Sequence, residues 1–334
     1  MATVSARSGS GTRISFDWSY RGFQACTMEN EFLKLTVIPQ VGAKVHEMIF
    51  KPADRDLLYH HPRVELRQPV FGGNVDNWWT GGIDDALPTG APCELDGEEL
   101  PFLGEAWSMP WTSERISATS VCFSREGVIT PFRIERTMEL RPGEPFVRQR
   151  HRITNVGTSP FRFIWGIHPG LPIGPATRIQ IPARRGVVQD SWPDNRLGET
   201  GATYQWPKSE MVELGPEAGG TWDLHYATEL DSGWLAAWDA EWGAGFGMTF
   251  PAELFRCVWV WLVDGGWRGI RCAAVEPWIG FPGRLDEAIA ADRAYRLEVG
   301  EVLTAETRLI GFETRSAIRG FDEEGRPVSD GAAM

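Results

Sequence analysis

Apolar and polar residues alternate with a period of two over much of this chain, and Gly, Pro, Asn and Asp separate the alternating runs. Because successive side chains of a strand point to opposite faces, this pattern predicts many antiparallel strands. Helical periodicity is nearly absent, and we expect one short helix near 285–291. The chain is predicted to be all-β. The clearest expected strands cover residues 32–38, 133–140, 146–154, 162–167, 234–238, 245–250, 258–263 and 306–311.

A length of 334 residues allows one large β sandwich or two smaller domains. No fixed-period repeat occurs, which disfavours a propeller or solenoid. The Pro- and Gly-rich stretches 81–99 and 170–186 lie between expected strands, as long loops of one domain do. We therefore predict a single domain over 29–312. An N-terminal extension, 1–28, leads into the first strands, and a partly disordered C-terminal extension covers 313–334.

The chain is acidic, with a formal charge of -12 and a pI near 5.1, and it has no run of Lys or Arg. A nucleic-acid or anionic-membrane partner is therefore not expected, because a phosphate-binding surface needs a basic footprint. The five cysteines are widely spaced and form no Cys-x-x-Cys pair, which favours reduced thiols. With no secretory signal pattern and no long apolar run, we expect a cytoplasmic protein. A small molecule is the expected partner, and homodimer formation is left open.

Two titratable residues each end a strand-like apolar run and directly precede a proline: His168 and Glu276. Strand ends are where a β scaffold presents catalytic groups to a ligand. Alone, the histidine could be a buried residue bonded to a carbonyl group, and the glutamate could be a surface ion-pair partner. Together they suggest an acid and a base. Alternation places His168 on the face of Arg162 and Gly166, where glycine leaves room for a ligand, and opposite Trp165, which we assign to the core.

Tryptophan is unusually frequent, with 16 Trp against 5 Tyr. Indole rings cover the apolar C–H faces of sugars, although most such rings fill a core. The loop 81–111 combines carboxylates with indoles, and carboxylates accept hydrogen bonds from sugar hydroxyls. Our candidates for substrate binding are Asp84, Asp85, Glu105, Trp107, Arg162, Trp261 and Trp278.

Four short segments in this order resemble motifs of the aldose 1-epimerase (galactose mutarotase-like) superfamily. They are Gly-Ile-Asp-Asp-Ala-Leu-Pro at 82–88, Phe-Leu-Gly-Glu-Ala-Trp at 102–107, His-Pro at 168–169 and Glu-Pro at 276–277. The resemblance spans about residues 29–311. It implies a β-supersandwich with a concave sugar-binding face, Glu276 as the base and His168 as the acid. One position departs from the family pattern: Leu103 stands where the family carries a second active-site histidine.

The resemblance implies interconversion of the α and β anomers of a monosaccharide, with no metal or organic cofactor. Ordinary pKa values would leave Glu276 ionised and allow His168 to be protonated by a neighbouring acid. One alternative is a carbohydrate-binding or regulatory protein without turnover, for which Leu103 is the main argument. A second is an epimerase for a phosphorylated or sulfonated sugar, which would use arginines such as Arg162, Arg178, Arg184 or Arg185. A glycoside hydrolase is disfavoured because it needs two carboxylates across the bond.

Overall fold

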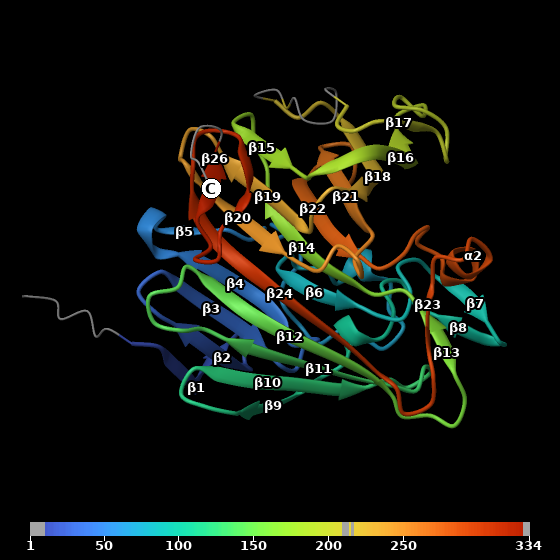
Figure 1. The fold of residues 1–334 in the computed structure, drawn as a ribbon, viewed down its shortest axis with the longest axis horizontal. Helices are drawn as coiled ribbons and strands as arrows, with labels where there is room; N and C mark the ends of the chain where they lie inside the picture. Colours follow the sequence, from blue (N-terminus) through green and yellow to red (C-terminus); the bar gives the residue numbers. More distant parts are fainter. Residues whose placement is uncertain (1–10, 209–213, 215–216, 330–334) are drawn as a thin grey trace, which may run out of the picture.

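The structure is a computed structural model that describes residues 11–208, 214 and 217–329. Strands account for most of it, and the one α helix assigned in these residues is the short α2 (Leu285–Ala290). Two large antiparallel sheets build the protein, and strands of the second sheet cross the front of the view in Figure 1. The all-β prediction is confirmed, as is the short helix.

The first sheet has twelve strands and carries the residues of the candidate site. Its centre is the run β6–β14–β22–β21–β18–β16, whose members come from distant parts of the chain. In spatial order the strands are β1 (Arg13–Tyr20), β2 (Phe23–Glu29), β3 (Leu33–Ile38), β4 (Lys44–Phe50), β6 (Ile83–Ala86), β14 (Gly166–Pro172), β22 (Arg271–Trp278), β21 (Cys257–Asp264), β18 (Thr221–Leu230), β16 (Ala183–Trp192) and β17 (Thr203–Gln205), with β5 (Arg55–Asp56) paired to β4.

The second sheet has eight strands. Their spatial order is β15 (Thr177–Gln180), β19 (Trp234–Asp239), β20 (Ala244–Thr249), β24 (Val302–Glu313), β12 (Phe146–Asn155), β11 (Phe132–Glu139), β10 (Ser120–Glu126) and β9 (Thr112–Arg115). Three two-stranded ladders lie beside the large sheets: β13 (Phe161–Phe163) with β23 (Tyr295–Leu297), β7 (Cys93–Leu95) with β8 (Glu98–Leu100), and β25 (Ile318–Phe321) with β26 (Pro327–Ser329).

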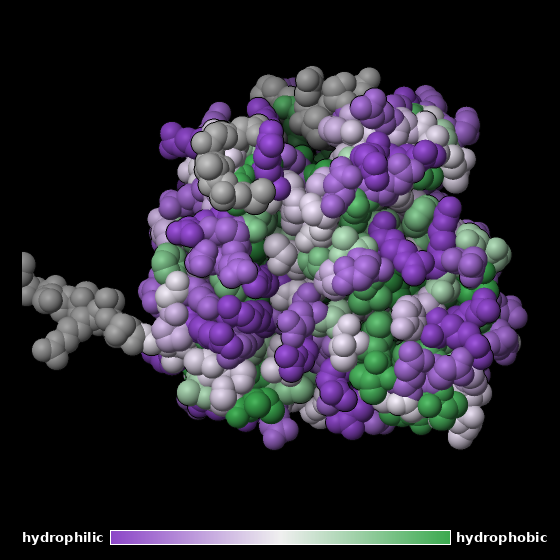
Figure 2. Space-filling model, in the orientation of Figure 1, coloured by the Kyte–Doolittle hydropathy of each residue, from purple (hydrophilic) through white to green (hydrophobic). Residues whose placement is uncertain are grey.

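Strand β11 illustrates how alternation builds the core. Phe132, Ile134 and Met138 are fully buried, while Arg133 between them is exposed. Such a strand buries one face and leaves the other to water. Strands at the centre of the first sheet, such as β22, are buried on both faces. On the face drawn in Figure 2, hydrophilic side chains surround smaller apolar patches, in keeping with the acidic composition.

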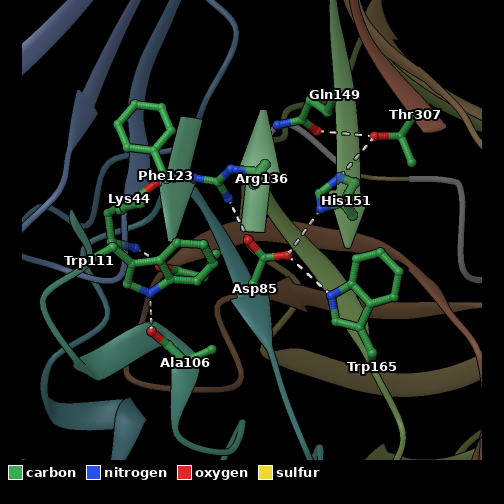
Figure 3. A network of polar contacts seen from close by, with 12 residues as sticks. Lys44, Asp85, Ala106, Trp111, Phe123, Arg136, Gln149, His151, Trp165 and Thr307 are labelled. Carbon is green, nitrogen blue, oxygen red and sulfur yellow. Dashed lines mark hydrogen bonds and ion pairs between the residues drawn. The ribbon is translucent and has the colours of Figure 1, made fainter. Parts of the chain in front are cut away.

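Arg136 occupies an apolar-face position of β11, yet it is a charged residue with only 1% of its surface exposed. Its guanidinium pairs with the carboxylate of Asp85 on β6 (Figure 3). The indole Nε1 of Trp165 donates to the same carboxylate at 3.1 Å, and His151 Nδ1 lies 3.9 Å from it. His151 Nε2 in turn lies 3.3 Å from the hydroxyl of Thr307 on β24. This polar network joins the two sheets through their shared core.

The prediction of one strand over 162–167 is wrong, because Ile164 and Trp165 interrupt the strand. The amide of Ile164 donates to the carbonyl of Pro88, and the carbonyl of Trp165 accepts from the amide of Ile279. These backbone groups therefore bond outside a regular ladder. The two halves become β13 and β14, which belong to different sheets, so Arg162 and His168 do not share one strand face.

Both ends of the chain contribute more strand than expected. β1 and β2 pair within the first sheet, so the sheet begins ahead of the boundary expected at residue 29. The C-terminal extension expected over 313–334 contains the β25–β26 hairpin, and residues 330–334 lie outside the described part. Within the described part, no helix combines the length and apolar character that crossing a membrane requires.

We predict that Arg136→Met strongly destabilises the protein. Removing the guanidinium leaves the Asp85 carboxylate buried without its cation, which costs about 3–5 kcal/mol. The matched control is Arg133→Met on the same strand, whose side chain is 46% exposed and for which we expect a change of about 0.5 kcal/mol or less. Urea unfolding measures both free energies. Equal effects in the two variants would contradict a stabilising role of the buried pair.

Candidate active site

The register of four neighbouring strands places charged and aromatic side chains in one row across the first sheet. His168 on β14 pairs with Asp84 on β6. On its other side, the pairs Gly166–Trp278 and Gly170–Ala274 enclose the positions of His168 and Glu276. Glu276 pairs in turn with Trp259 on β21. Because residues opposite each other project to the same face, His168 and Glu276 meet although the chain separates them by more than a hundred positions.

His168 and Glu276 border a cavity of about 320 Å³ on this face. The volume is in the range of small-molecule sites, which are mostly apolar with a few polar groups. Six of the fifteen described lining residues are Trp or Phe, and Leu103 also lines the cavity. The lining residues are Val75, Asp76, Trp79, Gly90, Phe102, Leu103, His168, Gln189, Asp190, Trp222, Leu224, Trp259, Trp261, Trp267 and Glu276.

The two titratable side chains are close to each other and buried. His168 Nε2 lies 3.6 Å from Glu276 Oε1, and the residues are 7% and 2% exposed. The indole Nε1 of Trp278 donates to Glu276 Oε2 at 2.8 Å. The ring of Trp79 stands perpendicular to the imidazole at 5.4 Å between centroids. These contacts hold both groups at the cavity wall and leave one carboxylate oxygen and Nε2 near each other.

Burial shifts the two pKa values in opposite directions. It raises the pKa of the Glu276 carboxyl to about 8, although the hydrogen bond from Trp278 lowers it. Burial, and then the charge of Lys44, lowers the pKa of His168 to about 3. In the free protein at neutral pH, the proton of the pair therefore resides mainly on Glu276, and the imidazole is neutral. The expectation that ordinary pKa values apply is wrong at this site, because burial removes the water that would stabilise the charged form of each group.

Asp84 is next to His168 in the row but does not line the cavity. Its carboxylate is 1% exposed and pairs with the ammonium of Lys44, which also donates to the carbonyl of Gly81 at 2.7 Å. The strand pair Val45–Ile83 explains this contact, since it places Lys44 opposite Asp84. Asp84 therefore holds a buried cation beside His168 in the free protein.

The two other candidate carboxylates also bond to the protein. Asp85 faces the second sheet, where it binds Arg136. Glu105 accepts hydrogen bonds from the backbone amides of residues 128, 129 and 130, at 2.6, 2.8 and 2.9 Å. Trp107 is buried and donates its indole Nε1 to the carbonyl of Phe102 at 3.0 Å. Asp85, Glu105 and Trp107 do not line the cavity, so the structure assigns these three candidates to folding contacts.

The arginines considered for an anionic sugar also lie away from the cavity. Arg162 is exposed on β13, opposite Arg296. Arg184 and Arg185 are exposed and pair with Asp231 and Glu229. Arg178 on β15 is exposed and donates to the carbonyl groups of Pro175 and Thr177. No lysine or arginine lines the cavity in the part of the chain that the structure describes.

Of the two remaining candidates, Trp261 lines the cavity and Trp278 lies behind it. Trp278 stacks on Trp259 with 3.9 Å between centroids and 11° between planes. A Cβ added at Gly166 would lie 2.1 Å from the Trp278 indole. The space expected beside the imidazole at Gly166 is therefore filled by the indole of Trp278. The absence of a side chain at Gly166 lets this indole reach Glu276, to which it donates.

Several lining residues were not among the sequence candidates. Trp79, Trp222, Trp259 and Trp267 complete the aromatic wall, and Asp76, Gln189 and Asp190 supply polar groups. The alternation of Trp259 with Trp261 on one strand was a usable signal, since it puts both indoles on the face of Glu276. Loop residues such as Asp76 carry no such signal. Across residues 11–208, 214 and 217–329, no group of three or more His, Cys, Asp or Glu side chains is arranged to hold a metal ion.

Comparison with known proteins identifies the fold. A family described as a domain of unknown function (DUF5107) matches residues 15–95. A candidate aldose 1-epimerase of Escherichia coli shares 18% identity at a TM-score of 0.64, covering 87% of this chain and 99% of that one. A candidate aldose 1-epimerase of Klebsiella pneumoniae shares 12% identity at a TM-score of 0.70, covering 91% of this chain and 84% of that one. A galactose mutarotase-like protein of Clostridium acetobutylicum shares 12% identity at a TM-score of 0.68, covering 91% of this chain and 99% of that one.

The chain therefore has the galactose mutarotase-like β-sandwich fold, as the sequence motifs suggested. Identities this low establish the fold and leave the activity to the residues of the site. Leu103, the departure from the family motif, lines the cavity and adopts a positive φ of 57°. The position is thus part of the site, and its side chain here is apolar.

We predict that Trp278→Phe raises the pKa of Glu276 further, because the variant loses the hydrogen bond that stabilises the charged carboxylate. Trp261→Phe is the control, since Trp261 lines the same cavity without bonding to Glu276. A carbon-detected NMR titration of the glutamate carboxyl groups measures both variants. An unchanged or lower pKa in Trp278→Phe would show that the indole does not stabilise the carboxylate.

Proposed function

We propose that this protein is an isomerase that interconverts the α and β anomers of an aldose by opening and reclosing its ring. The observation that carries the proposal is the approach of His168 Nε2 to Glu276 Oε1, 3.6 Å, at the wall of an aromatic cavity. The two oxygens that exchange protons in this reaction are both bonded to C1 of the sugar. An acid and a base this close can therefore serve both oxygens from one wall.

The proposed reaction moves two protons. Glu276 takes the proton of the C1 hydroxyl, the C1–O5 bond breaks with its electron pair going to O5, and His168 donates a proton to O5. Rotation about the C1–C2 bond then presents the other face of the aldehyde. On reclosure O5 attacks C1, its proton returns to His168, and Glu276 returns a proton to O1. The pair ends as it began, so one shared proton suffices.

The first step needs the proton on His168 and the charge on Glu276, the reverse of the free protein. Sugar hydroxyls that donate to the carboxylate would stabilise its charged form and lower the pKa of Glu276. Binding would thereby favour transfer of the shared proton to the imidazole. The aromatic wall supports this role, because indole faces cover C–H groups of the sugar and exclude water.

We predict that Glu276→Gln and His168→Ala each lose about 10²- to 10⁴-fold of the acceleration, the range of general acid–base assistance. Glu241→Gln, which changes an exposed glutamate, should retain full activity. The assay follows a freshly dissolved α-anomer toward equilibrium by polarimetry or NMR, across a panel of aldoses. Acceleration that persists in both site variants would reject the assignment of these residues.

We predict that kcat/KM falls as the pH rises through about 8. The pair must retain one proton, and this proton is lost when the pH exceeds the raised pKa of Glu276. No loss is expected between pH 5 and 7, because the lowered pKa of His168 lies well below that range. Rates must be corrected for the uncatalysed reaction in each buffer. A kcat/KM that increases through pH 8 would contradict the shared-proton mechanism and favour Glu276 acting as a base without its partner.

A carbohydrate-binding protein without turnover is the second candidate, favoured by Leu103. An apolar side chain there supplies no hydrogen bond to the sugar. Saturable binding of aldoses with no rate enhancement by the wild-type protein would select this function. An epimerase for phosphorylated or sulfonated sugars is disfavoured, because the described lining carries no cation to receive the anionic group.

A further inference from the structure

The cavity extends well beyond the catalytic pair along the first sheet. A second row of paired residues runs parallel to the first, from Ala274 on β22 through Trp261 on β21 and Leu224 on β18 to Asp190 on β16. The strand path from β22 to β16 crosses three intervals. At 4.7–4.9 Å per interval, the backbones at the two ends are about 14 Å apart. One pyranose ring is about as wide as a single interval.

We propose that the cavity holds an oligosaccharide, with its reducing sugar at His168 and Glu276 and the next sugar in a second subsite toward Asp190. The second subsite consists of Trp222, Leu224, Trp261, Trp267, Gln189 and Asp190. The placement of the reducing sugar rests on the proposed function. The second subsite itself rests on the extent and chemistry of the lining.

The side chains of the second subsite suit a sugar ring. Trp222, Trp261 and Trp267 are only partly buried, so their rings are available to a ligand. The ring of Trp261 meets Trp267 edge to face at 5.2 Å, and this contact braces both indoles. Asp190 has an exposed carboxylate in which one oxygen accepts its neighbour's amide. Carboxylates and amides that border aromatic rings give a sugar both hydroxyl partners and an apolar platform.

Trp79 links the two subsites and carries a free donor. Its ring contacts His168 at 5.4 Å on one side and Trp261 at 5.8 Å on the other. The residue is 5% exposed, and its indole Nε1 has no hydrogen-bond partner within the described residues. A buried donor without a partner is costly, so such groups usually await a ligand or water. An oxygen of the ligand between the two subsites would accept this hydrogen bond.

The catalytic end gives an independent reason for a second subsite. Leu103 bonds through its amide to Gly90, which packs against the Trp259 ring beside Glu276, and its apolar side chain cannot bond to a sugar hydroxyl. A single sugar would thus find few polar partners there. Binding energy from a remote part of a substrate can hold the reacting part in position. A second sugar on the indoles would supply this energy.

The charges at the cavity favour a neutral oligosaccharide. The acidic residues of the described lining are Glu276, Asp76 and Asp190, and this lining contains one histidine, His168. Two cations among the described residues lie close to the lining: Lys44, which is paired with Asp84, and Arg268, whose guanidinium lies 4.4 Å over the Trp267 ring and donates to Asn77 and the carbonyl of Asp76. The donors of both residues are directed to the protein, and neither residue lines the cavity.

The test compares reducing disaccharides with their own reducing-end monosaccharides. Glucose is paired with maltose, cellobiose and gentiobiose, and binding to the wild-type protein is measured by calorimetry and by tryptophan fluorescence. We expect at least one disaccharide to bind about tenfold more tightly than glucose, equivalent to about 1.4 kcal/mol. If every disaccharide binds no more tightly than glucose, or if none of these sugars binds, the proposal is rejected.

Three variants test whether the tighter binding of a disaccharide comes from the second subsite. Trp222→Ala should abolish the disaccharide advantage while leaving glucose affinity within about twofold, and Trp222→Phe should keep most of the advantage because an aromatic platform remains. Trp18→Ala removes an indole that is 63% exposed on β1, outside the cavity, and should have no effect. Equal weakening of glucose and disaccharide binding by Trp222→Ala would overturn the second subsite.

The two proposals fail in different ways. A disaccharide advantage without acceleration of anomer exchange rejects the isomerase and retains the second subsite. Acceleration with glucose and no disaccharide advantage retains the isomerase and rejects the second subsite. The binding measurements therefore do not depend on turnover.

Discussion

The register between β14 and β22 is the constraint on which the candidate site depends. The pairs Gly166–Trp278 and Gly170–Ala274 fix this register, and they set His168 beside Glu276 on one face. A slip of one residue in either strand would turn one of these side chains toward the second sheet. Trp278 occupies the space above Gly166 and binds Glu276, so the packing that favours the register also orients the carboxylate.

Burial gives this pair its proton chemistry. In water the glutamate would be ionised and the histidine partly protonated near neutral pH, but the aromatic cavity disfavours both charged forms. The pKa of Glu276 rises and that of His168 falls, so one proton is retained by the pair over a wide pH range. Lys44 contributes to the lowered pKa of His168, and its own charge is balanced by Asp84.

The sequence predicted the strands well and the site in part. Alternation located most core strands, and the positions of His168 and Glu276 before prolines singled out the pair that the structure brings together. It did not reveal that Asp84 binds Lys44 or that Asp85 binds Arg136, because these contacts depend on strand order and on residues distant in the chain. The break between β13 and β14 was missed since its backbone partners are loop residues.

Glu276 differs from three buried aspartates that form ion pairs, and from Glu105, whose charge is stabilised by three backbone amides. Asp84, Asp85 and Asp223 each pair with a cationic side chain, Lys44, Arg136 and Arg196 respectively. Glu276 has only an indole donor and a neutral imidazole among the described residues. A buried carboxyl without a cation costs stability and is therefore uncommon outside functional sites. Glu276 instead lies at the end of an aromatic cavity, where it is protonated in the free protein and where a ligand could complete its hydrogen bonds.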